Sequence, residues 1–99
     1  MTQTNNQPDQ PIAKFWAGQF FATKGARQEI GFEEILMALN RHKSGDWGDV
    51  CPEDWQANET ALQDGGRLFS VYHDQNGTKF WIITEADRSI TTVLMPDEY

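Results

Sequence analysis

The sequence predicts an α+β fold, with a small antiparallel sheet of about four strands and two helices packed on one face. Apolar residues follow a helical spacing over 32–41, and a second helix begins at Pro52. From Arg67 the apolar period changes to two, which indicates strands. Short connections make the last three strands an antiparallel meander, and an antiparallel sheet with helices on one face belongs to the α+β class.

The length of 99 residues fits a single domain. Residues 1–13 are polar and contain two prolines, so we expect a flexible N-terminal tail followed by one domain over 14–99. Four Trp, six Phe and two Tyr supply a core that disordered chains lack. The chain is therefore expected to fold.

The first half of the domain is predicted to contain one strand and one clear helix. An aromatic segment predicts a strand over 19–23, followed by a turn at 24–26 and a helical turn over 27–30. The helix covers 32–41, with acids in its first turn and cations at its end, where the helix dipole favours them. Its predicted apolar stripe is Phe32, Ile35, Leu36 and Leu39.

The second half is predicted to be a helix and the meander. Pro52 opens the helix and Gly65 ends it. The pair Asn76-Gly77 is a strong hairpin signal between a strand over 67–73 and another over 79–84. The segment 79–84 is apolar on both faces, so we expect it in the centre of the sheet, and 90–95 forms the last strand.

Negative charge is concentrated in one quarter of the chain. The net charge is −7, and no Lys or Arg lies between Asp46 and Asp64. The acids of this stretch are Asp46, Asp49, Glu53, Asp54, Glu59 and Asp64. Direct binding to a phosphate backbone requires the opposite sign. An acidic surface suits a basic protein partner, or serves solubility alone.

Targeting and redox signals are sparse. The N-terminus has no apolar core of a signal peptide, and no run of 18 apolar residues is present, so we expect a cytoplasmic protein that does not contact a membrane. The single Cys51 has no partner for an internal disulfide, and we expect a small buried residue rather than a nucleophile.

Residues 41–49 form the most chemically capable segment, Arg-His-Lys-Ser-Gly-Asp-Trp-Gly-Asp. As a catalytic site, it would use His42 as a general base oriented by Asp46 or Asp49. As a structural corner, it would be a helix end followed by an Asp-rich turn, with Trp47 plugging the edge of the core. A binding surface is the third option. His42, Asp46, Asp49 and His73 are metal-ligand types, but their spacing matches no metal motif, so no metal or cofactor is expected.

A second polar segment lies in the turn between the last two strands. Glu85, Asp87 and Arg88 are either an acidic pair with a positioned guanidinium or an Asp-stabilised turn in which Arg88 bridges to a neighbouring acid. If Arg88 reached Asp46 or Asp49 while His42 reached Glu85, the two segments would form a joint polar site of Arg41, His42, Glu85, Asp87 and Arg88.

Several motifs together resemble a family of small bacterial proteins found on plasmids and other mobile elements, some with a restriction-related label. The matching pieces are Phe21 to Ala26, Arg41 to Asp49, Glu53-Asp54 with Asn58, Ser70 to Tyr72, and Trp81 to Tyr99. The resemblance covers Gln19 to Tyr99 and implies no established activity. A methyltransferase is excluded, because the chain is too short for a doubly wound cofactor domain and has no Gly-rich phosphate loop.

The composition and the resemblance together predict a non-enzymatic protein-binding module of a mobile element. It would use its acidic surface to engage or inhibit a basic host partner, such as a CRISPR or restriction defence complex. The predicted contact residues are Asp46, Trp47, Asp49, Glu53, Asp54, Glu59 and Asp64. Two alternatives remain: a small enzyme or metal-dependent factor built on the polar segments, and a homodimeric structural module joined through the aromatic surface near Trp16.

Overall fold

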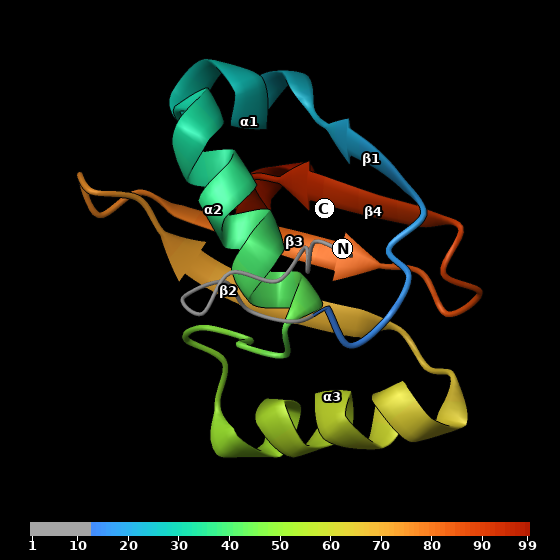
Figure 1. Ribbon diagram of the computed structural model, residues 1–99. Coiled ribbons are helices and arrows are strands. Elements are labelled where there is room, and N and C mark those ends of the chain that lie inside the picture. The colour runs from blue at the N-terminus through green and yellow to red at the C-terminus, as the bar shows by residue number, and fades with distance from the viewer. Residues whose placement is uncertain (1–12) are drawn as a thin grey trace, which may run out of the picture.

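The computed structural model describes residues 13–99 and shows an α+β fold (Figure 1). Four strands form one mixed sheet in the order β1-β4-β3-β2. The elements are β1 (Gln19–Ala22), α1 (Lys24–Glu29), α2 (Phe32–Lys43), α3 (Pro52–Asp64), β2 (Leu68–His73), β3 (Lys79–Thr84), β4 (Ile90–Leu94) and a 3₁₀ turn at Pro96–Glu98. The predicted tail lies, except for Ala13, outside the described residues.

The three C-terminal strands form the predicted meander. β2 pairs with β3 and β3 with β4, both antiparallel, so β3 is central as expected. The prediction of a fully antiparallel sheet is wrong for β1, which pairs with β4 in parallel. Hairpin connections force antiparallel pairing only between neighbouring strands. More than sixty residues separate β1 from β4, so no short turn fixes their direction.

Between Ala13 and Tyr99 the structure has three α-helices where the sequence predicts two, and the three do not share one face of the sheet (Figure 1). The segment predicted as a turn and a helical turn is the helix α1, capped by the Thr23 side chain, which accepts from the Ala26 amide. α2 lies across one face of the sheet, whereas α3 runs beside the outer strand β2 (Figure 1). Asn58 of α3 bonds both backbone groups of Phe69, which face away from β3.

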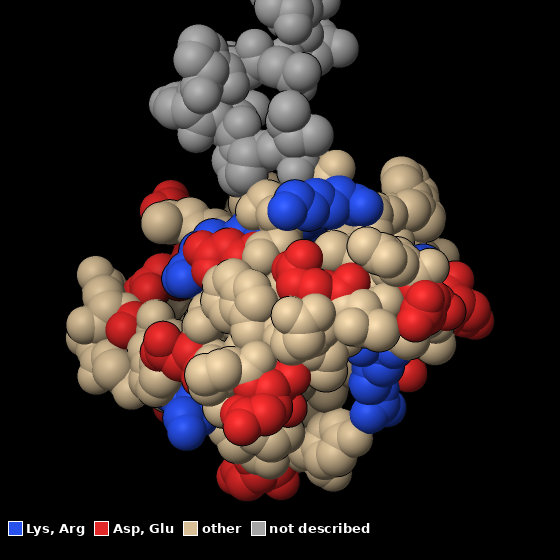
Figure 2. Space-filling view, turned by 90° about the horizontal axis from the view of Figure 1, so that it is seen from below, with Lys and Arg blue, Asp and Glu red and all other residues tan. Residues whose placement is uncertain are grey.

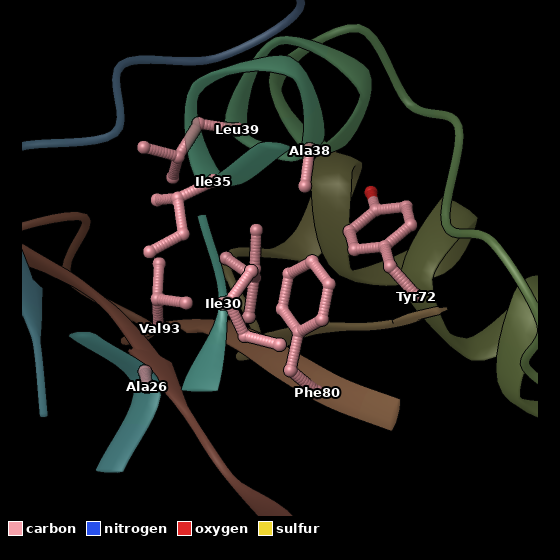
Figure 3. Packing of buried hydrophobic residues seen from close by; sticks show 9 residues of the cluster. Ala26, Ile30, Ile35, Ala38, Leu39, Tyr72, Phe80 and Val93 are labelled. Carbon is pink, nitrogen blue, oxygen red and sulfur yellow. The ribbon is translucent and has the colours of Figure 1, made fainter. Parts of the chain in front are cut away.

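The main core lies between α1, α2 and the helix-covered face of the sheet (Figure 3). Ile35 and Leu39 point toward Val93, while Tyr72 and Phe80 close the other side. A second cluster contains Trp47, Ala61 and Leu68, and it joins α3 to the edge of the sheet. The first cluster includes Leu39, just before the segment 41–49, and the second includes Trp47 within it, so both ends of this segment are anchored to the core.

The buried stripe of α2 is rotated from the predicted one. Its buried side chains are Ile35, Ala38, Leu39 and His42. Phe32 is 72% exposed and Leu36 is 42% exposed. The periodicity correctly predicts a helix, but the apolar arc of this helix is wider than the part that the sheet covers.

Within residues 13–99, no helix is both long and apolar enough to cross a membrane.

Candidate functional site

His42 is the centre of the segment 41–49, and it is fully buried. Its ring packs edge-on against Phe15, at 5.4 Å between centroids, and against Trp47, at 5.5 Å. Nδ1 lies 2.6 Å from the Ser70 hydroxyl, and Nε2 lies 2.9 Å from the Thr84 hydroxyl. Both ring nitrogens are therefore occupied by groups of the sheet.

A chain of hydroxyl groups fixes the protonation of this imidazole. The Thr91 hydroxyl donates to the Ala17 carbonyl at 2.6 Å, so it must accept the bond from Thr84, also at 2.6 Å. Because the Thr84 proton is thus used, Thr84 accepts from Nε2 of His42. Because the ring is neutral at pH 7, Nδ1 accepts from the Ser70 hydroxyl. His42 is accordingly the neutral Nε2–H tautomer.

The electrostatics agree with this assignment. Burial and, to a smaller extent, the positive charge of Arg88 lower the pKa of His42 to about 3. At neutral pH the ring carries no charge and offers neither nitrogen to a substrate. His42 is a packed and hydrogen-bonded core residue rather than a general base or a capping cation.

Arg41 and Asp46 close the turn that follows α2. Nε of Arg41 donates to Asp46 Oδ2 at 2.8 Å, and the guanidinium lies 4.7 Å from the centroid of the Tyr72 ring. The hydrogen bond from Arg41 lowers the pKa of Asp46. Tyr72 donates its hydroxyl to the Asp46 carbonyl at 2.6 Å, and burial raises the pKa of that phenol. Each charged group of the turn thus has a partner in its own neighbourhood.

Trp47 and Gly48 lie along the outer edge of β2. Trp47 is fully buried, and its indole donates to Glu59 at 2.8 Å. Gly48 pairs with Val71 in a short parallel bridge and has a φ of 75°. A Cβ at Gly48 would lie 2.0 Å from the Val71 carbonyl oxygen. The predicted core plug is therefore confirmed, whereas Trp47 cannot contact a partner as proposed from the sequence.

The second polar segment, 85–88, contacts the C-terminal end of α3. Nη1 of Arg88 donates to the Gly66 carbonyl at 2.6 Å, and Nη2 donates to the Ala61 carbonyl at 3.0 Å. α3 has no basic residue in its last turn, so Arg88 brings a cation to the carbonyl end of the helix. Asp87 accepts from the Ser89 amide and hydroxyl, which is the predicted Asp-stabilised turn. Glu85 lies 3.5 Å from Arg67.

The joint polar site is not formed. His42 bonds Ser70 and Thr84 rather than Glu85, and Arg88 bonds carbonyls rather than Asp46 or Asp49. Asp49 instead pairs with His73 at 2.8 Å. A hollow of about 90 Å³ lies beside the corner and includes Arg41 in its lining, but not His42. Over the described part of the chain, no group of three or more His, Cys, Asp or Glu is arranged to hold a metal ion.

The acidic side chains of α3 remain on the surface. Glu53, Asp54 and Asp64 are exposed, whereas Glu59 is half-buried against Trp47. Figure 2 views the molecule from the side of α3 and shows red acidic groups spread over this face, with fewer blue basic groups. Cys51, expected to be buried, is exposed just before the helix.

The sequence did not predict the structural roles of two sets of polar residues. The hydroxyls of Ser70, Thr84 and Thr91 hold His42, and the amide of Asn58 closes the edge of β2. The signal for the first set was a run of hydroxyl side chains at inward-facing positions of the strands. The signal for Asn58 was a polar residue on the apolar side of α3.

No family model, curated protein or solved structure matches this chain. The resemblance to proteins of mobile elements therefore stays a prediction.

Proposed function

We propose that this chain is a non-enzymatic protein-binding module that docks a basic partner on α3. The observation that carries the proposal is the charge of this helix. α3 carries Glu53, Asp54, Glu59 and Asp64 and has no Lys or Arg. Three of these carboxylates are exposed, and among residues 13–99 they have no salt-bridge partner.

The polar segments that suggested an enzyme support this choice by their structural roles. His42 is enclosed by hydroxyls, Arg88 holds the end of α3, and Arg41 closes a turn. All three stabilise the position of α3 and of the corner that precedes it. The helix is thus a rigid platform for its outward charges, and a rigid platform lowers the entropic cost of binding.

The docking face also contains an apolar anchor. Trp55 is 38% exposed on α3, beside Asp54 in the sequence and one turn before Glu59. An indole next to carboxylates suits an arginine of the partner, because a guanidinium stacks on the ring while it pairs with the acid. Exposed ion pairs are each worth about 0–1 kcal/mol, so the charges set orientation and association rate while Trp55 supplies affinity.

The chemistry of this face fits a partner that itself binds nucleic acid. Such proteins expose dense positive charge to contact phosphates, and an acidic helix can occupy that surface. A CRISPR or restriction complex of the host is the class that the resemblance to mobile-element proteins suggests. Binding would then compete with DNA.

The test is capture of host proteins by the tagged full chain in three versions. The first is the natural sequence, and the second carries Glu53→Lys, Asp54→Lys and Asp64→Lys. The third is a matched control with Glu29→Lys, Glu33→Lys and Asp97→Lys. Each triple change raises the net charge from −7 to −1, because each substitution adds two charges.

The proposal predicts a host protein that is retained by the natural chain and the control, released by salt or by added DNA, and lost with the α3 variant. Retention by all three versions, or no specific partner at all, would show that α3 is not a docking face. Thermal unfolding of each version establishes that the substitutions left the fold intact.

A further inference from the structure

The two edge strands of the sheet differ in whether other parts of the chain bond to their outer backbone groups. The outer edge of β2 is closed by the amide of Asn58 and by the bridge at Gly48. β1 lies at the opposite edge, and within residues 13–99 no strand pairs with its outer side (Figure 1). Soluble proteins usually protect such an edge with charge, proline or a bulge. β1 reads Gln-Phe-Phe-Ala and has none of these.

The hydrogen bonds to β4 show which backbone groups of β1 point outward. The amide of Gln19 donates to Ser89, and that of Thr23 donates to Val93. Backbone groups alternate in direction along a strand, so those of Phe20 and Ala22 face away from β4. Two residues thus offer two donors and two acceptors at the open edge.

An apolar groove runs between β1 and α2, next to this edge. The groove has a volume of about 220 Å³. Four exposed apolar side chains line it: Phe20 (46% exposed), Phe21 (51%), Phe32 (72%) and Leu36 (42%). Trp16, which is 79% exposed, extends the surface past Phe20. With about 150–250 Å² for each aromatic side chain, these five residues leave roughly 600 Å² of apolar area in water.

We propose that a second copy of this chain covers this surface, with β1 pairing antiparallel to β1 of the partner. A two-fold axis beside Phe21 places Phe20 opposite the partner's Ala22, and the two residues exchange both backbone hydrogen bonds. The same axis repeats that exchange, which uses all four outward groups. Phe21 then lies directly against the partner's Phe21, and the two four-stranded sheets become one sheet.

A second copy fits this surface for three reasons. The outward amide and carbonyl groups of Phe20 and Ala22 can pair with the same groups of a second copy about a single two-fold axis. The exposed apolar side chains supply most of the area, about 800 Å² per partner, that stable interfaces bury. Arg27 and Lys43 border the apolar surface and no carboxylate lines it, so it is unsuited to the basic partner of α3. Since α3 lies at the opposite edge, both copies keep that helix free.

The register makes a test by disulfide formation specific. Facing residues of a non-hydrogen-bonded antiparallel pair have Cα atoms about 4.5 Å apart, which a disulfide can span. Phe21→Cys, in a Cys51→Ser background, should therefore cross-link to its partner within minutes of mild oxidation. Gln19→Cys is the matched control on the same face, and its two copies would be roughly 13 Å apart, too far for a bridge.

A second measurement uses the full chain by sedimentation equilibrium. The natural chain should show twice the 11.3 kDa protomer mass. Ala22→Pro removes an outward amide that β4 does not use, so it should weaken the dimer about tenfold or more and leave the helical circular dichroism unchanged. A natural chain that stays monomeric, equal cross-linking at both positions, or a dimer unaffected by Ala22→Pro would overturn the proposal.

Discussion

Lowering the pH from 7 to 5 should destabilise this protein by about 2 kcal/mol, chiefly through His42. The folded chain holds the imidazole neutral, with a pKa of about 3, whereas an unfolded histidine has a pKa near 6.5. Below pH 6.5 the unfolded chain therefore binds a proton that the folded chain does not. The stability is complete above pH 6.5 and is lost progressively as the pH falls toward 3.

The magnitude follows from the width of that window. Each pH unit below 6.5 costs about 1.4 kcal/mol, so pH 5 costs about 2 kcal/mol. The carboxyl groups with lowered pKa values, such as Asp46, affect stability only below about pH 4, because the unfolded carboxyl group gains its proton there. The interval from pH 7 to 5 therefore reports on histidine.

Urea unfolding followed by Trp fluorescence at pH 7, 6 and 5 measures the effect. His42→Gln retains one donor and one acceptor for Thr84 and Ser70 but does not titrate, so its stability should depend much less on pH. His73→Gln, the matched change at the other histidine, separates the contribution of His42 from that of His73. A flat response of the natural chain, or an imidazolium signal of His42 by NMR at pH 5, would refute the reasoning.

Three further substitutions test the structural roles assigned above. Gly48→Ala forces a Cβ against a carbonyl of β2 and should cost at least about 2 kcal/mol, whereas Gly77→Ala meets open space at a similar φ and should cost about 1 kcal/mol by urea unfolding. Arg88→Ala leaves the Gly66 carbonyl without its donor, removes one of the bonds to the Ala61 carbonyl, and should speed hydrogen exchange in the last turn of α3, with a loss of about 1–3 kcal/mol in the same urea assay. Asn58→Leu removes both bonds to the edge of β2 and should cost about 2 kcal/mol, and a variant as stable as the natural chain would show that this edge needs no cover.

The local elements could be predicted because their signals are local. The hairpin at Asn76-Gly77, the start of α3 at Pro52 and the central strand β3 each depend on residues close together in sequence. The parallel pairing of β1 with β4 could not be predicted, because no nearby turn specifies it. The rotation of the α2 stripe was missed because periodicity defines an apolar arc but not how much of it the sheet covers.

For the polar segment 41–49, the sequence indicates the local turn but not the long-range partners of its side chains. The burial of Trp47 and the bond from the Gly48 amide to Asp46 agree with the structural corner, which was one of three interpretations of this segment, and not with Trp47 as a contact residue. The partners of His42 lie 28 and 42 residues away, so no local pattern identifies them. Arg88 was expected to pair with an acid, but the carbonyl end of α3 lies closer and lacks any cation of its own.

Hydrogen exchange of the chain, alone and bound to its captured host partner, tests the location of binding most directly. The amides of α3, within 52–64, should exchange more slowly in the complex, and those of β3 should not change. Protection centred on another element, with α3 exchanging at the same rate in both states, would contradict the proposal that this acidic helix is the docking surface.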